Sequence, residues 1–472
     1  MISARSIIGI GMCAAVSLVG SNAAFAQAAP AAAPTGTVAE RLTALEAKTD
    51  APGLWKTLGF QVSGTALVSY QQNFNNPQTN NTQLRSFDTD ANSFMANLAQ
   101  IMFERPANAS GTGMDRAGFR ARINFGADAR YSRARTDVQP GAQNTELDVQ
   151  ELYGEYIAPV GNGLKIQAGK INTLIGYEVI NAWENPNFSR TFMFGFGQAF
   201  TTTGVRFTYP FNDMVTATIG LINGWDNIDD NNRGKSFEYL LALTPDPRFG
   251  ISFYGSYGAE QSNGNSNFGF STASGSGGCT PGPGCDPTAK RTVVGSIITV
   301  KPTDQDTIIL EPYYGNEGNA ATDTGKQPTL GGNASGNARW NGIVTYITHD
   351  FNDQTQPNAF SLRVRGEIFE DAGGARTCGG GVNFAGGANT CAQSGANPTG
   401  STFVPTNFDG AHKNGFAQTL WETTFTLQYK PIPQLQTRME FRYDKSDQNA
   451  FLRGSEAVNN QQTLGFSVAY MW

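Results

Sequence analysis

Stretches in which apolar and polar residues alternate run through most of this 472-residue chain. The last eleven residues show the pattern most clearly. Leu464, Phe466 and Val468 point to one side of an extended chain and small or polar residues to the other, because strand side chains alternate with period two. A strand whose apolar face closes on an aromatic residue, Trp472, is typical of a barrel in the outer membrane, where that face contacts lipid.

The same alternation recurs in fourteen earlier segments. Within 119–127, Phe119 and Ile123 lie on one face, whereas Arg120 and Arg122 lie on the other. The pattern therefore predicts an all-β transmembrane antiparallel barrel over 57–472. The fourteen segments are 57–70, 119–127, 152–158, 164–168, 201–209, 215–221, 237–243, 249–257, 291–300, 307–314, 340–348, 361–368, 416–429 and 435–443.

The connections between these segments alternate in length. The short ones all contain Pro, which fixes a turn dihedral, and they lie at 105–117, 159–163, 210–213, 245–247, 302–305, 352–357 and 431–433. The long ones lie at 71–91, 131–147, 170–198, 223–234, 259–289, 315–337, 370–413 and 445–460. Seven short and eight long connections predict 16 strands with both ends on one side, which is the plan of outer-membrane porins.

Aromatic residues at the strand ends provide a separate check on this plan. If the apolar faces contact lipid, outward positions near both membrane interfaces should be aromatic. At the ends next to long connections these are Tyr70, Tyr257 and Tyr443, and at the ends next to short ones they are Tyr209, Tyr429, Tyr470 and Trp472. We therefore expect two aromatic girdles; the alternative is the ordinary enrichment of Tyr in strands.

The N-terminus predicts export. Arg5 precedes an apolar stretch at 7–20, and Ala24-Phe25-Ala26 fits a processing site, so residues 1–26 are expected to be a secretory signal peptide. Hydrophobic content is only 39%, below the roughly 45–50% of a typical globular domain, which fits a barrel with a wet interior. The 31 Phe and 15 Tyr argue against a disordered chain, and the net charge of −6 does not suggest a nucleic-acid partner.

Two segments precede the predicted barrel. Residues 27–36 are an Ala/Pro-rich linker, and 37–50 has the pattern of a short helix with Val38, Leu42 and Leu45 on one side. So short a helix cannot associate alone, but three copies attached to a trimeric barrel could form a coiled coil. The alternative is a frayed or monomeric helix.

The cysteines beyond the signal peptide fall into two close pairs. Cys279 and Cys285 bracket one Gly-rich stretch, and Cys378 and Cys391 bracket another. Local closure of each loop costs the least entropy, so we expect these two disulfides among the three possible pairings. Zinc binding is the alternative, with His349 and His412 as the only histidines.

Charged residues concentrate on the inward faces of the predicted strands. Arginines gather near 120, 363 and 438, and we expect them to form a basic wall that favours anions. The alternative is that individual arginines brace the barrel through ion pairs, although like charges on alternate positions of one strand repel. The predicted pore-lining residues are Arg120, Arg122, Arg130, Arg206, Arg363, Arg365, Arg438 and Arg442.

The third long connection, 170–198, is too apolar for a solvated loop. An apolar loop needs a place to be buried, and the barrel mouth offers one. We therefore expect it to fold inward and narrow the pore, with Glu178, Glu184 and Arg190 as lining groups. The alternative is packing of its aromatic residues at a subunit interface.

Several motifs in the first half of the chain resemble the OmpL-like β-barrel porin family. They are 70–75 (YQQNFN), 92–94 (NSF), 169–173 (GKINT), 176–178 (GYE), 185–190 (NPNFSR), 203–206 (TGVR), 209–211 (YPF), 223–226 (NGWD) and 231–232 (NN). The resemblance covers about 60 to 260 and weakens beyond. It implies an integral outer-membrane porin of Gram-negative bacteria and does not identify the solute.

Other functions fit the sequence less well. A barrel enzyme needs a nucleophile or carboxylate pair beside a histidine, and no such arrangement is evident. A gated transporter with a plug domain would need about 22 strands. We therefore predict a passive diffusion channel for small hydrophilic solutes or ions, without catalysis or cofactor, and expect it to be a homotrimer. The alternative is a plugged structural or adhesive outer-membrane barrel.

Overall fold

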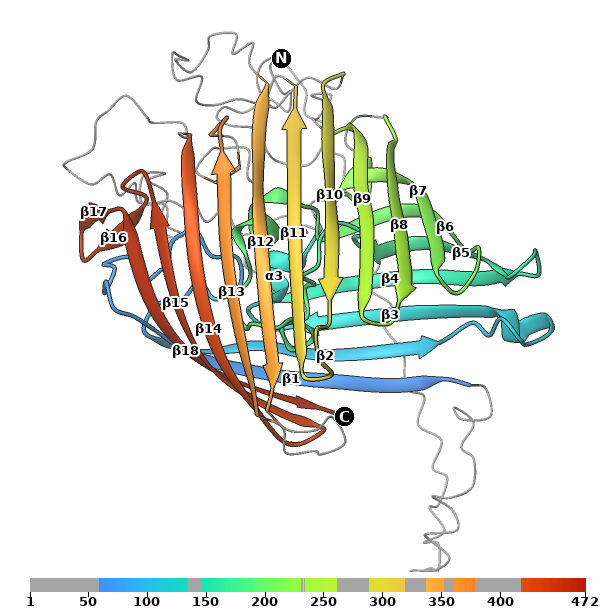
Figure 1. Cartoon of the computed structure of the whole chain (residues 1–472), viewed down its shortest axis with the longest axis horizontal. Coiled ribbons are helices and arrows are strands. Elements are labelled where there is room, and N and C mark those ends of the chain that lie inside the picture. Colours follow the sequence, from blue (N-terminus) through green and yellow to red (C-terminus); the bar gives the residue numbers. More distant parts are fainter. Residues whose placement is uncertain are drawn as a thin grey trace, which may run out of the picture. The chain divides into compact units, whose positions relative to one another are not determined.

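Sixteen antiparallel strands close into a barrel (Figure 1). The computed structural model describes residues 59–134, 146–230, 232, 234–260, 288–318, 337–351, 360–374, 376–377 and 417–472. The expected signal peptide (1–26), linker (27–36) and helix (37–50) lie outside the described residues. So do the four cysteines that are expected to form disulfides, Cys279, Cys285, Cys378 and Cys391.

The barrel strands follow one another around the ring in chain order. They are β1 (Gln61–Asn73), β2 (Ser93–Arg105), β3 (Ala117–Phe125), β4 (Leu147–Ala158), β5 (Leu164–Asn172), β6 (Thr201–Pro210), β7 (Val215–Trp225), β8 (Ser236–Asp246), β9 (Phe249–Ala259), β10 (Lys290–Val300), β11 (Asp306–Glu317), β12 (Ala338–Asp350), β13 (Phe360–Asp371), β14 (Gln418–Ile432), β15 (Leu435–Ser446) and β18 (Asn460–Met471). The short strands β16 (Phe451–Arg453) and β17 (Glu456–Val458) form a separate hairpin in the last long connection.

The predicted strand number and the alternation of short and long connections are confirmed. Boundaries moved by a few residues; the first strand, expected at 57–70, runs from Gln61 to Asn73. The third strand ends at Phe125, two residues earlier than expected, because Gly126 takes a φ of +116° that leaves the extended conformation. Among the described residues, no helix is long and apolar enough to span a membrane.

The ring closes between its first and last strands. Their pairing runs from Thr65 opposite Met471 to Asn73 opposite Thr463, so neither strand is left with an open edge. Gly64 is required at this seam because a Cβ there would lie 2.1 Å from the ring of Trp472. The backbone N–H of Gly64 donates to the carbonyl of Trp472 at 3.1 Å.

The two faces of each strand differ as the alternation predicts. On β18, Phe466 and Val468 are 44% and 40% exposed, whereas Ser467 between them is 5% exposed. Aromatic side chains at the strand ends are also outward, and Tyr257 and Trp472 are more than half exposed. The outer surface is therefore a band of apolar side chains suited to lipid.

A charge placed on this outer surface should destabilise the barrel. Phe425 lies in the middle of β14 and is 48% exposed. We expect Phe425→Arg to lower the free energy of unfolding in lipid vesicles by about 2–4 kcal/mol, the usual cost of Arg near the bilayer midplane. Phe425→Leu should change it little. Equal stability of the two variants in a urea titration would place this face away from lipid.

Candidate functional site

Loop 3, the connection 173–200 between β5 and β6, lies inside the barrel. Its side chains Phe192, Phe194 and Phe196 are at most 1% exposed and pack in one apolar cluster with the inward-facing Trp340 and Phe369. The rings of Phe196 and Phe369 lie 6.4 Å apart, and the indole N–H of Trp340 donates to the carbonyl of Gly197 at 3.1 Å. One part of the barrel wall is therefore apolar on its inner face because loop 3 covers it.

Two carboxylates of the barrel wall hold the backbone of loop 3. Glu367 on β13 accepts the amide N–H groups of Phe192 and Met193 at 2.6 and 2.7 Å. Glu440 on β15 accepts those of Phe188 and Ser189 at 2.6 and 2.9 Å. A buried amide without an acceptor is costly, so each carboxylate satisfies two groups that water cannot reach.

Arginines of the same wall hold the loop carbonyls. Arg438 donates to the carbonyls of Ala182 and Asn185 at 2.8 and 2.6 Å. Arg365 pairs with Glu178 of loop 3 at 2.9 Å and with Glu422 of the neighbouring strand at 2.6 Å. These guanidinium groups bind the loop and do not point into open solvent.

Loop 1, the connection 74–92, forms a second layer. Its Arg85 pairs with Asp444 on β15 at 3.0 Å, and both side chains are at most 1% exposed. The ring of Phe87 packs on Phe194 with centroids 6.0 Å apart, and the Arg190 guanidinium lies 4.4 Å from the centroid of Phe87. The apolar residues of loop 1 were the only sequence signal for this inward position.

Seven of the eight predicted pore-lining arginines divide into two groups. Five are at most 7% exposed and have partners: Arg122, Arg206, Arg365, Arg438 and Arg442. Arg120 and Arg363 are partly accessible, with side chains 31% and 18% exposed. Repulsion between Arg120 and Arg122 does not prevent either from forming an ion pair, since Glu151 lies 3.6 Å from Arg120 and 3.2 Å from Arg122.

The placement of Arg130 on a strand is wrong. It lies on the short helix α3 (Ala129–Ser132), in the connection that follows β3. The in-and-out alternation of strand side chains does not apply at this position, because the strand ends before Gly126. The Arg130 side chain donates to the carbonyl of Ala127 at 3.1 Å and lies 4.0 Å from Asp90.

The three residues expected to line a constriction also differ in environment. Glu178 is 2% exposed and accepts both the amide and the hydroxyl of Thr191, at 2.8 and 2.9 Å. Arg190 is 3% exposed and donates to the carbonyls of Phe188 and Ile180. Glu184, on the short helix η3 (Ala182–Glu184), is exposed and is the one of the three whose side chain solvent reaches.

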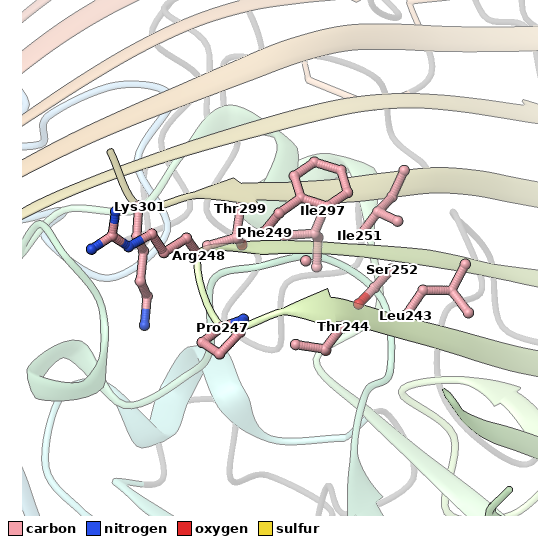
Figure 2. A pocket seen from close by; sticks show the side chains of 11 residues that line it. Leu243, Thr244, Pro247, Arg248, Phe249, Ile251, Ser252, Ile297, Thr299 and Lys301 are labelled. Carbon is pink, nitrogen blue, oxygen red and sulfur yellow. The ribbon is translucent and has the colours of Figure 1, made fainter. Parts of the chain in front are cut away.

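A pocket of about 240 Å³ lies apart from loop 3, where the turn 247–248 joins β8 to β9 (Figure 2). It is lined by Thr244, Ser252 and Thr299, with Arg248 and Lys301 at its end. No lining residue belongs to loop 3, so this pocket is a feature of the barrel rim. Among the described residues, no group of three or more His, Cys, Asp or Glu could hold a metal ion.

The comparisons with known proteins agree with this architecture. The family model described as "Putative beta-barrel porin-2, OmpL-like" matches residues 59–472. Among solved structures, the anion-selective porin from Comamonas acidovorans is 6% identical, with a TM-score of 0.50 over 88% of this chain and 99% of that chain. At that identity the likeness shows a shared fold.

Two further structures are similar over most of their length. OmpT of Vibrio cholerae is 12% identical, with a TM-score of 0.46 over 88% of this chain and 97% of that chain. The outer membrane channel DcaP of Acinetobacter baumannii is 10% identical, with a TM-score of 0.48 and the same coverages. No curated protein sequence matches the chain significantly.

Removing one anchor of loop 3 should loosen it locally. In Glu367→Gln a neutral amide replaces the carboxylate. The side-chain NH2 group of Gln then faces one of the two backbone N–H groups, and two donors cannot form a hydrogen bond. We expect a local loss of about 1.5–3 kcal/mol, which is about 10- to 100-fold faster amide exchange at Phe192 and Met193. Hydrogen exchange followed by mass spectrometry measures this directly.

The matched control is Glu370→Gln on the same strand. Glu370 is 37% exposed at its side chain and lies 3.6 Å from Arg339, outside the barrel. Exchange in loop 3 should be unchanged in this control. Unchanged exchange in Glu367→Gln as well would contradict the anchoring.

A buried carboxyl beside loop 3 should make stability depend on pH. Burial raises the pKa of Asp128 from 3.8 to about 6, against the opposing effects of Arg190, Asn97 and Arg130, while Asp88 raises it further. Between about pH 4 and 6 the folded state then binds more protons than the unfolded state, so stability falls as pH rises. Asp128→Asn should flatten this part of a melting-temperature profile in detergent. The same slope in wild type and variant would contradict the assignment.

Proposed function

Because this chain belongs to the OmpL-like β-barrel porin family and is an integral outer-membrane protein, we propose that it is a passive diffusion channel for small hydrophilic solutes, narrowed by loop 3. The observation that carries the proposal is the anchoring of loop 3 across the barrel, through Glu367 on β13 and Glu440 on β15. A loop held by charge-assisted hydrogen bonds has a fixed position, and a fixed position is what a size limit requires.

The side chains that meet the solute are, in this proposal, those that remain accessible around loop 3. On the loop these include Trp183, which is half-buried, and Glu184, which is exposed. On the wall they include Arg120 and Arg363. Of the arginine-rich wall, only the arginines that do not bind loop 3 are then available to the solute.

The alternative is a plugged barrel with a structural or adhesive role. The observation that favours it is the apolar cluster inside the barrel, in which loop 1 contributes Leu84 and Phe87 and loop 3 contributes Phe192 and Phe194. The two functions differ in one property that can be measured. A diffusion channel passes current in steps when single molecules enter a lipid bilayer, whereas a plugged barrel does not.

Truncating the half-buried Trp183 of loop 3 should widen the channel. We expect Trp183→Ala to raise the rate at which the largest permeant sugars enter proteoliposomes by about twofold or more, with smaller sugars less affected, because passage depends on the narrowest radius. Trp421→Ala is the matched control, since Trp421 lies on the outer face of β14 and is 37% exposed. Equal swelling rates for both variants would remove Trp183 from the constriction.

A further inference from the structure

Cations gather on one side of the barrel, at the ends of β13, β14 and β15 that lead into the short connections. Arg363 is on β13, Lys430 on β14 and Arg438 on β15. In the sheet Arg363 lies opposite Thr426 and Arg438 lies opposite Gln428. Arg363 and Arg438 repel the charge of Lys430, whereas Asp350 attracts it. Arg438 donates to the carbonyls of Ala182 and Asn185, so this group lies against loop 3.

The positive charge of this group is poorly balanced. The nearest carboxylate of Arg363 is Asp350, at 3.8 Å, and the buried Nε of Arg363 has no hydrogen-bond acceptor among the described residues. Lys430 forms none of the ion pairs found in the described part of the chain. Arg438 donates to loop carbonyls and to Gln428, which are uncharged, and Glu440 is the carboxylate that attracts its charge.

On the opposite wall, the cations Lys165 and Arg120 are paired with carboxylates. The strand β5 lies eight places from β13 around the sixteen-strand ring. Its Lys165 pairs with Glu155 at 2.9 Å, and the neighbouring Arg120 pairs with Glu104 at 2.8 Å. The field across the barrel at this level is therefore positive on one side, and an anion is drawn to that side.

We infer that Arg363 and Lys430 form an anion-binding subsite beneath loop 3, for a small solute that carries a carboxylate or phosphate group. This inference rests on the proposed channel function and names its preferred solute class. Arg363, whose side chain is 18% exposed, supplies N–H donors in a planar fork, and Lys430 supplies a point charge. Arg438 is too buried to touch a solute, at 5% exposure, but its charge adds to the field.

The test records reversal potentials of the folded protein in planar bilayers across gradients of potassium acetate and potassium phosphate. The wild type should favour the anion. Arg363→Gln and Lys430→Gln should each lower the anion-to-potassium permeability ratio by about threefold to fivefold, the size expected for one charge a few ångströms from an ion in water. The double variant should lower it further.

Lys165→Gln is the matched control, because it removes one positive charge from the opposite wall at the same level. It should shift the ratio clearly less than Lys430→Gln. An equal shift, or a double variant with unchanged selectivity, overturns the subsite and leaves the channel intact. Absence of current from the folded wild type overturns the channel.

A second measurement tests the subsite without conduction. The phosphorus resonance of inorganic phosphate should broaden when the folded protein in detergent is added, and broaden much less with the double variant. Equal broadening by the wild type and the double variant overturns the subsite, whatever the bilayer recordings show.

Discussion

A loop inside a barrel must have its backbone amides and carbonyls satisfied by the wall, since water reaches few of them. Glu367 and Glu440 meet this requirement for four amides of loop 3, and Arg438 meets it for two carbonyls. The charges on β13 and β14 follow from the same need, because Arg365 pairs both with Glu178 of the loop and with Glu422 of the neighbouring strand.

This use of charge decides which groups are left to act on a solute. Arg365 and Arg438 donate to oxygens of the loop and of neighbouring strands, and so contribute to stability and shape. The partly accessible cations Arg363 and Lys430 retain charge that the described residues do not neutralise fully. Different residues of the same wall therefore hold the loop in place and select the solute.

The sequence predicted the barrel well because strand alternation and turn residues are local. Sixteen strands and their connections followed from period-two patterns and Pro-containing turns. The partners of single charges are not all local. Arg122 pairs with Glu151 on the next strand, and Arg85 pairs not only with Asp88 but also with Asp444, 359 residues away. No pattern along the chain specifies such pairs, and parity could not place Arg130 beyond the strand end.

The central claim is that the wall carboxylates hold loop 3 where it limits passage. The most direct measurement is the single-channel conductance of wild type and of the double variant Glu367→Gln, Glu440→Gln in the same planar bilayers. A released loop should give a larger and noisier conductance in the double variant. Identical conductance and noise in two folded proteins would contradict the account.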